Sequence, residues 1–326
     1  MKKVLIAILL LGLLPHASAD YIHWVDFRLS APVLRSALEL DMASQGGEQP
    51  LDWIDILALA AAWRGGTGVT VADTQRAAQA LRGDTPPERL PGMAGRFFSY
   101  YRAAYGAALG GLVGHFAIRR TDPQTGEAEW IPAYGLKAFS PIAAGYFWSH
   151  YPDFGAQRSY GYARPHLGND ILGALGTPIC AVEGGTVEAL GWNRYGGWRI
   201  GIRSDDRKRY YYYAHLRKDT PYAEGLAVGQ RVQAGEVIGF MGRTGYSAQE
   251  NVNNIETVHL HFGLQLIFDE SQKECDSEIW IDVYPIIELL ASHCSSVARD
   301  PQTGRWERLY PYCDLDAEPL RSAAAR

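Results

Sequence analysis

The sequence lacks any excess of positive charge. Its 326 residues include 31 lysines and arginines against 36 aspartates and glutamates, which gives a formal net charge of −5 at pH 7. Lysine and arginine do not gather in any one segment. Because nucleic-acid binding depends on a basic surface that neutralises phosphates, we expect no nucleic-acid partner.

Long apolar runs are absent beyond the first twenty residues. Near the start, two lysines precede an apolar run at residues 4–14, and small residues follow at 17–19. This pattern predicts a signal peptide at residues 1–19, so that the mature chain begins at Asp20. The alternative is an uncleaved membrane anchor, but the run is shorter than the roughly 20 residues that span a bilayer. We therefore expect a secreted or extracytoplasmic protein with no membrane span in the mature chain.

Cysteine is scarce, with four residues in the whole chain. None of them has the short CxxC spacing of a structural zinc site, so a site of that kind is excluded. Export permits disulfides, and the clustering of three cysteines in the C-terminal part favours a bridge among those three. The fourth lies in an apolar, strand-like segment, where a free thiol and a bridge are equal alternatives. The fourth is Cys180, and the three are Cys275, Cys294 and Cys313.

The hydrophobic content of 47% is ample for a packed core, and its pattern changes along the chain. An alanine- and leucine-rich helical pattern predicts a small all-helical N-terminal domain at residues 20–125. Within it we expect helices that begin near Asp52, at Thr70 with a capping box, and near Gly92.

Short apolar segments punctuated by glycine replace the helical pattern from about residue 133. They predict an antiparallel β-sheet or sandwich domain at residues 126–292, closed by an amphipathic helix at 281–292, and a polar C-terminal tail at 293–326. The predicted fold class is therefore α+β. The candidate strands are 177–182, 186–192, 199–204, 209–216, 237–241 and 260–268.

Two histidines flank a single leucine at His259-Leu260-His261. Because alternate residues of a strand point to the same face, these imidazoles should project side by side into one cleft. Upstream, His166-Leu167-Gly168-Asn169-Asp170 contains a turn-favouring Gly-Asn pair, so we expect His166 and Asp170 to reach the same point from a loop. Imidazole nitrogen and carboxylate oxygen suit zinc, and a catalytic zinc site has three protein ligands and an open fourth position. The two clusters together predict a metal site.

A further histidine, His215, ends a run of four tyrosines at 210–213, which indicates a strand with bulky groups on both faces. Three segments in this order resemble the signature motifs of the lysostaphin-like or LytM-type zinc endopeptidases, which cut peptidoglycan cross-linking peptides. These segments are His166-x-Gly168-x-Asp170, Tyr213-Ala214-His215-Leu216 and His259-x-His261. The glycine-containing stretches at 176–178 and 229–239 also match, and the similarity covers roughly residues 134–268.

The resemblance implies that His166, Asp170 and His261 bind one zinc ion, and that His215 and His259 are catalytic groups outside the ligand set. Five ligands would also leave no position for water. In the implied reaction a metal-bound water attacks a peptide carbonyl, His259 deprotonates or orients that water, and His215 stabilises the oxyanion. The division between these two histidines is open at this stage. The family's domain is a compact antiparallel β structure of the duplicated hybrid motif type, with a groove over the metal.

Two segments are candidates for binding the substrate peptide. The stretch at 243–258 is long and polar for a hairpin connection, so we expect it to form a groove wall, with Tyr246 and Asn254 facing the substrate. The alternative is an ordinary surface loop. Tyr160 and Tyr162, just before the first motif, are expected to face the same groove.

These residues predict an exported zinc-dependent endopeptidase that hydrolyses cross-links or stem peptides of peptidoglycan. The alternative is a non-catalytic cell-wall-binding or activator protein on the same fold, since some relatives of these peptidases have lost ligands. All five site residues are present here, which favours the enzyme. Histidines that do not lie at ligand spacing from another possible ligand, such as His150 and His293, are expected to be structural.

Overall fold

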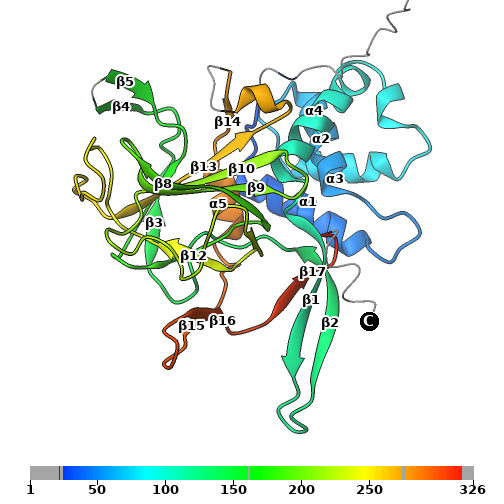
Figure 1. Ribbon diagram of the computed structural model, residues 1–326. Helices are drawn as coiled ribbons and strands as arrows, with labels where there is room; N and C mark the ends of the chain where they lie inside the picture. Colours follow the sequence, from blue (N-terminus) through cyan, green and yellow to red (C-terminus); the bar gives the residue numbers. More distant parts are fainter. Residues whose placement is uncertain (1–21, 23–24, 161, 274–276, 318–326) are drawn as a thin grey trace, which may run out of the picture.

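The computed structural model describes residue 22 and residues 25–160, 162–273 and 277–317 (Figure 1). The predicted signal peptide and Cys275 lie outside these residues. Helices gather in the N-terminal part and antiparallel strands make up most of the rest, which confirms the predicted α+β class. Within the described ranges, no helix combines the length and the apolar character needed to cross a membrane.

Four α-helices build the N-terminal part. The second helix begins where the side chain of Asp52 accepts a hydrogen bond from the backbone N–H of Ile54, and the third where Thr70 and Asp73 form the predicted capping box. The alanine- and leucine-rich middle of the second helix is buried on all sides, because it contacts each of the other three. The helices are α1 (Ala31–Ser44), α2 (Trp53–Arg64), α3 (Val71–Leu81) and α4 (Met93–Leu109), with a short 3-10 helix, η1 (Pro87–Arg89), before α4.

An eight-stranded antiparallel sheet forms the centre of the second part. Its strands follow the order β11, β8, β9, β10, β13, β6, β3, and β14 also pairs with β13. A strand lies at each of the six predicted positions. The sheet consists of β3 (Trp148–His150), β6 (Asn169–Gly173), β8 (Gly185–Asn193), β9 (Gly197–Ser204), β10 (Arg209–Ala214), β11 (Arg231–Val232), β13 (His259–Leu266) and β14 (Ile279–Trp280). Two smaller sheets pair β7 (Pro178–Cys180) with β12 (Val237–Phe240), and β4 (Gln157–Tyr160) with β5 (Tyr162–Pro165).

The register gives this sheet two different faces. Tyr212 of β10 lies opposite Gly263 of β13, and Ala214 lies opposite His261, so these positions share one face. The alternate residues of β10, Tyr211 and Tyr213, point the other way and are buried in the core. The tyrosine run therefore serves both the core and the face that carries His261.

A buried arginine connects the helical part to the sheet. Arg209 of β10 donates hydrogen bonds to the carbonyl oxygens of Gly106 and Ala107 near the end of α4. Its guanidinium also pairs with Glu183 at 2.7 Å, and the hydroxyl of Tyr211 donates to the same carboxylate at 2.6 Å. One continuous hydrophobic core runs through the helices and the sheet. The two parts therefore pack as one body.

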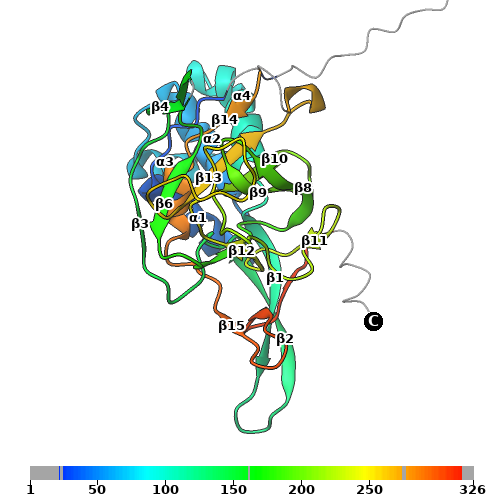
Figure 2. The same ribbon diagram turned by 60° about the vertical axis from the view of Figure 1, so that its left-hand side comes forward.

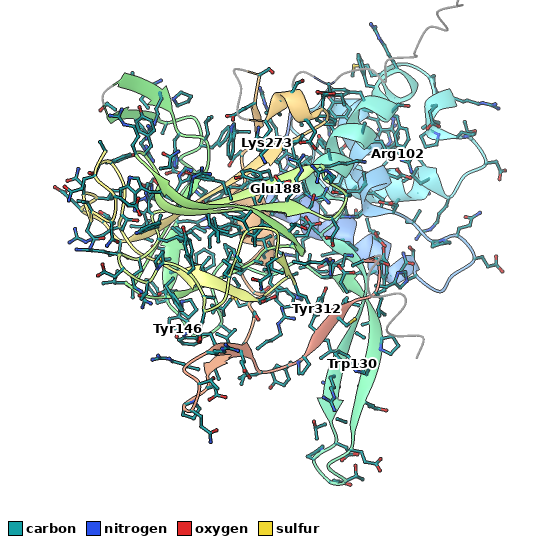
Figure 3. The ribbon with its side chains drawn as sticks, viewed as in Figure 1. Arg102, Trp130, Tyr146, Glu188, Lys273 and Tyr312 are labelled. Carbon is teal, nitrogen blue, oxygen red and sulfur yellow. The ribbon has the colours of Figure 1, made fainter. Side chains whose placement is uncertain are left out.

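A long hairpin of β1 (Val113–Thr121) and β2 (Ala128–Leu136) crosses the predicted boundary at 125/126 and projects from the body in both views (Figures 1 and 2). Its third strand, β17 (Tyr312–Asp314), comes from the predicted tail, which also forms β15 (Val297–Arg299) and β16 (Trp306–Arg308). Tyr312 is buried there, whereas Trp130 is half-exposed (Figure 3). The helical pattern therefore ends at α4. The sequence did not predict the hairpin because its outer half is exposed and lacks an alternating apolar pattern.

Two smaller expectations also differ from the structure. The closing helix, α5 (Tyr284–Leu290), is shorter than the predicted 281–292 and has a proline in its first turn. Cys180, Cys294 and Cys313 are free thiols, so the favoured C-terminal bridge is absent between the two cysteines of that group that the structure describes. Burial raises the pKa of Cys180 to about 12, which keeps this thiol neutral and inert.

Candidate metal centre

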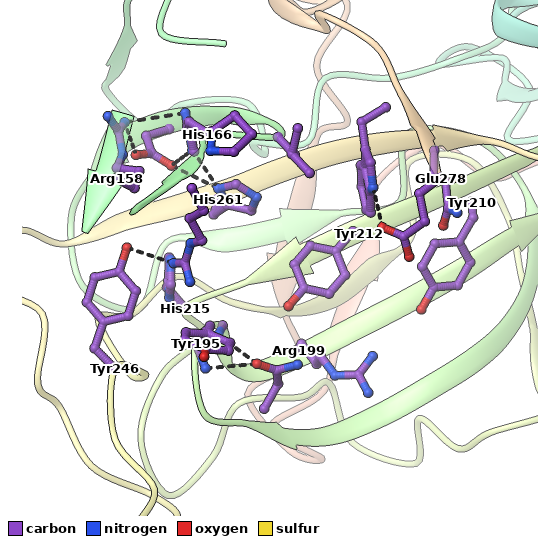
Figure 4. Close-up of a pocket in the computed structure, with 18 residues that line it drawn as sticks. Arg158, His166, Tyr195, Arg199, Tyr210, Tyr212, His215, Tyr246, His261 and Glu278 are labelled. Carbon is purple, nitrogen blue, oxygen red and sulfur yellow. Dashed lines mark hydrogen bonds and ion pairs between the residues drawn. The ribbon is translucent and has the colours of Figure 1, made fainter. Parts of the chain in front are cut away.

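The three predicted ligand side chains meet at one point, and Figure 4 shows His166 and His261 side by side there. His166 Nε2 lies 3.0 Å from Asp170 Oδ1 and 2.8 Å from His261 Nδ1. His261 Nδ1 lies 3.1 Å from the same Asp170 oxygen. In the described part of the chain, this is the one group of three or more histidine, cysteine or acidic side chains whose ligand atoms can surround a metal ion.

Strand pairing brings these residues together. Asp170 belongs to β6, where the sequence predicted a loop, and it lies directly opposite His261 of β13. His166 reaches the same point from the loop that precedes β6. The glycine between them is required by packing, because a Cβ at Gly168 would lie 2.7 Å from His261 Cε1 and 2.7 Å from the backbone oxygen of Phe262. The loop can approach β13 this closely only without a side chain at that position.

Hydrogen bonding leaves acceptor atoms facing the common point. His166 Nδ1 lies 3.2 Å from the backbone oxygen of Asp153, and a carbonyl oxygen can only accept, so Nδ1 carries the proton. The lone pair on His166 Nε2 therefore faces the carboxylate oxygen of Asp170 and the ring nitrogen of His261. Two imidazole nitrogens and one carboxylate oxygen are a donor set that zinc accepts, at ligand distances of about 2.0–2.2 Å. The residues present fit such an ion.

The ionisation states also suit metal binding. Burial by itself would raise the pKa of Asp170, but its contacts with the imidazole rings of His166 and His261 hold that pKa well below its usual 3.8. Burial lowers the pKa of His261, so its ring is neutral at pH 7. An ionised carboxylate and neutral imidazoles are the forms that bind metals.

A set of polar residues outside the cluster holds it in place, and the sequence analysis missed them. The carboxylate of Asp153, almost fully buried, lies 3.1 Å from His166 Nδ1 and 2.8 Å from the guanidinium of Arg158. Arg158 also donates to Asp170 at 3.1 Å. The amide of Asn169 donates to Asp153, and its oxygen lies 2.6 Å from a ring nitrogen of His150. No local sequence pattern predicts these contacts, because Asp153 lies thirteen residues before His166.

We expect Asp153→Asn to weaken metal binding about 10- to 100-fold, because partners that orient a ligand histidine typically contribute that much. The amide keeps the size of the side chain but removes the charge that faces His166 and Arg158. Competition with a chromophoric chelator measures the affinity. Asp122→Asn, at an exposed turn of the β1–β2 hairpin, is the matched control. Equal affinities in the two variants would contradict a role for Asp153 in ligand orientation.

His215 and His259 lie beside the cluster but outside it. Their ring centroids are 4.7 Å apart, and His259 Nε2 lies 3.7 Å from Asp170 Oδ1. The Nδ1 atoms of the two rings face the backbone oxygens of Thr244 and Thr257, each at 2.9 Å. Both rings therefore carry the proton on Nδ1 and present an unprotonated Nε2.

The backbone adopts unusual conformations to place the ring of His215. This residue has φ +62°, a region that residues other than glycine rarely occupy. Gly245, with φ +123°, passes so close that a Cβ there would lie 3.1 Å from His215 Nδ1. Burial, and then the charges of His259 and His261, lower the pKa of His215 well below 6.5. The ring is therefore neutral at pH 7, and its unprotonated Nε2 is a weaker base than that of an exposed imidazole.

A groove of about 670 Å³ opens over the cluster. Tyr246 lines it, and the hydroxyl of Tyr246 accepts a hydrogen bond from Arg164 at 3.4 Å. Asn254 is not among the described residues that line the groove, since its amide donates to the backbone oxygen of Tyr246 at 2.6 Å and so supports that residue. The side chains of Tyr160 and Tyr162 lie outside the description. That these two tyrosines contact the substrate stays a prediction.

Comparison with known proteins gives a consistent set of similarities. Residues 164–274 match peptidase family M23. The L-Ala–D-Glu endopeptidase of Bacillus subtilis (strain 168) is 36% identical over 178 residues, which cover 51% of this chain and 52% of that protein. The glycyl-glycine endopeptidase ALE-1 of Staphylococcus capitis is 38% identical over 98 residues, which cover 30% of this chain and 24% of that protein. A crystal structure of a LytM-named protein from Ruminococcus gnavus ATCC 29149 is 26% identical, with a TM-score of 0.48, over 82% of this chain and 91% of that one. The chain thus matches about half the length of the first enzyme and about a quarter of the second.

Proposed function

Because the chain contains a peptidase family M23 domain, homologous to peptidoglycan endopeptidases of the LytM and lysostaphin type, we propose that it hydrolyses peptide bonds of peptidoglycan with one zinc ion. The ligands would be His166, Asp170 and His261. The observation that carries the proposal is the convergence of their three ligand atoms within 3.1 Å of one another. A cation between them would be attracted by the ionised carboxylate and by the lone pairs of neutral imidazoles.

The ion and the two nearby histidines would divide the chemistry. When bound, zinc supplies Lewis-acid polarisation of a carbonyl and lowers the pKa of a water to about 7. His259 and His215 each present an unprotonated Nε2 beside the cluster, so either can take the proton of the attacking water. The ring that has taken the proton then has an Nε2–H, which can donate to the oxygen where negative charge develops or to the leaving amine. Because Nε2 of each ring begins without a proton, each ring can accept a proton first and donate a hydrogen bond afterwards.

The groove would hold the peptide. It follows the face of the sheet from the cluster past Tyr212 toward Tyr210, so an extended peptide in it would place one carbonyl group over the three ligands (Figure 4). Tyr246, at the mouth beside His215, is placed to donate a hydrogen bond to that peptide; the two rings are 5.9 Å apart. The predicted signal peptide would deliver the enzyme to the side of the membrane where peptidoglycan lies.

A non-catalytic wall-binding or activator role on the same fold is the alternative. Proteins of that kind lack part of the ligand or catalytic set. Here the three ligand candidates and both additional histidines lie in one group, with His215 and His261 rings 5.8 Å apart. The complete set therefore favours the enzyme.

Defined muropeptides incubated with the purified mature chain test the proposal. We expect mass spectrometry to show cleavage at a peptide bond, loss of that cleavage when a chelator removes the metal, and its recovery on addition of Zn²⁺. The control is the chelator-treated protein without added metal, checked by circular dichroism for an intact fold. Binding to cell walls without any released peptide would support the non-catalytic alternative, and cleavage that persists without metal would contradict the zinc assignment.

A further inference from the structure

The groove continues beyond the metal centre, and its far end carries charges that the proposed reaction does not use. Arg199 of β9 and Glu278, just before β14, line this end together with Tyr210, Gln265 and Trp280. Figure 4 shows Arg199 below the two tyrosine rings of β10, with its guanidinium directed away from His166. Substrate residues on one side of the scissile bond would lie here.

The sheet register fixes the position of Arg199 relative to the metal centre. His261 lies opposite Ala214, and Ile200, the residue after Arg199, lies opposite Tyr213. Arg199 is therefore two strands away from His261 in nearly the same row, which corresponds to roughly 10 Å between their backbones. Because an extended peptide rises about 3.3 Å per residue, a group bound by Arg199 would be within about three residues of the cleaved bond.

The guanidinium of Arg199 makes no hydrogen bond or ion pair with another described residue. Its Nε is buried without a hydrogen bond, and no carboxylate forms an ion pair with its guanidinium. Neighbouring arginines differ: Arg158 pairs with Asp153, and Arg203 with Glu270. Arg164, at the other end of the groove, stacks on a tyrosine ring and donates to Tyr246.

Among the described residues, one carboxylate lines this end of the groove, and it does not neutralise Arg199. Glu278 accepts a hydrogen bond from the indole of Trp280 at 2.8 Å and makes no ion pair with Arg199. A partly buried guanidinium without a partner is unfavourable in the free protein, and a bidentate carboxylate is the ligand that best satisfies its planar donors.

We propose that Arg199 binds a carboxylate of the substrate and thereby selects peptides with a free acidic group within about three residues of the cleaved bond. The inference rests on the proposed peptidase function and adds the substrate class to it. In peptidoglycan peptides, such a carboxylate comes from a glutamate residue or from a diamino acid. Both present the same chemistry to Arg199.

Two pairs of muropeptides distinguish these sources. In one pair the glutamate carboxyl is free or amidated, and in the other the carboxyl of the diamino acid is free or amidated. For the wild-type enzyme we expect kcat/KM to be about 10- to 100-fold higher for the free acid than for the amide in one pair, mainly because KM is lower. This is the effect of losing one charge-assisted hydrogen bond when the carboxyl group is amidated. Arg199→Gln should bring that ratio close to one by lowering kcat/KM for the free acid alone. Arg199→Lys, which keeps the positive charge, should restore part of the preference.

Two control variants separate a direct contact from a general effect of charge. Glu278→Gln removes the opposite charge at the same end of the groove, and Arg119→Gln removes a positive charge on the exposed hairpin. Both should keep the preference for the free acid. Calorimetry of the same peptides, with turnover blocked by His259→Ala, gives a binding readout independent of hydrolysis.

The outcomes separate the two proposals. Failure of the wild-type enzyme to cleave any muropeptide would overturn the peptidase function, and this inference with it. Cleavage without discrimination in either pair, or an unchanged ratio in Arg199→Gln, would overturn the role of Arg199 alone.

Discussion

Alanine in place of His261 or Asp170 should eliminate both metal retention and peptide hydrolysis. Each change removes one of three proposed ligand atoms, so we expect a loss of metal affinity greater than the roughly 100-fold typical of an outer partner. His261→Ala also opens space against Gly168, and Asp170→Ala leaves the guanidinium of Arg158 without one of its two carboxylates. Metal content after dialysis, measured by atomic emission, and muropeptide cleavage are the two measurements.

A matched control for these variants is His115→Ala, which removes an exposed histidine from β1. It should bind metal and cleave peptide like the unchanged protein. Thermal unfolding monitors the fold of all three variants without added metal. Full zinc content in both His261→Ala and Asp170→Ala would refute the ligand assignment.

Replacing His259 by alanine should have the second largest effect, with the metal retained. Its Nε2 lies 3.7 Å from Asp170 Oδ1, outside the group of three proposed ligand atoms, and its Nδ1 faces the backbone oxygen of Thr257. We expect the turnover of muropeptides to fall by about 100- to 10,000-fold, the usual contribution of a positioned acid or base. Zinc content should equal that of the unchanged protein.

The corresponding change at His215 helps to separate the two histidines. If the two rings act on one proton, the double variant His215→Ala/His259→Ala should lose little more activity than the less active of the two single variants. The rate losses of residues that act as a unit do not add. Digestion of purified cell wall by His259→Ala at the parental rate would show that this residue has no catalytic role.

Several features of the site were already present in local sequence patterns. The alternation of a strand predicted that His259 and His261 share a face, and the structure places both in β13 beside Asp170. Strand and helix periodicities also predicted the six strands and the helices of the N-terminal part. These predictions depend on neighbours a few residues apart, which is the range over which a pattern can be read.

Other features depend on contacts between distant segments. The β1–β2 hairpin is completed by β17, nearly two hundred residues later, and its exposed outer half has no apolar alternation. Asp170 lies in a strand because β6 pairs with β13, a partnership that a Gly-Asn pair does not reveal. The free thiols of Cys294 and Cys313 likewise depend on where the folded chain places them.

The sequence by itself determined which chemical groups are available: two imidazoles at strand spacing, a carboxylate four residues from a third imidazole, and a glycine small enough to lie against them. Only the tertiary structure decided that the ligand atoms of these groups meet at one centre, that His215 and His259 keep their protons on Nδ1, and that Arg199 faces the groove without an ion pair to any described carboxylate. The reason is physical: residue type sets the donors and acceptors, but strand register and backbone carbonyls from distant segments set their directions and protonation.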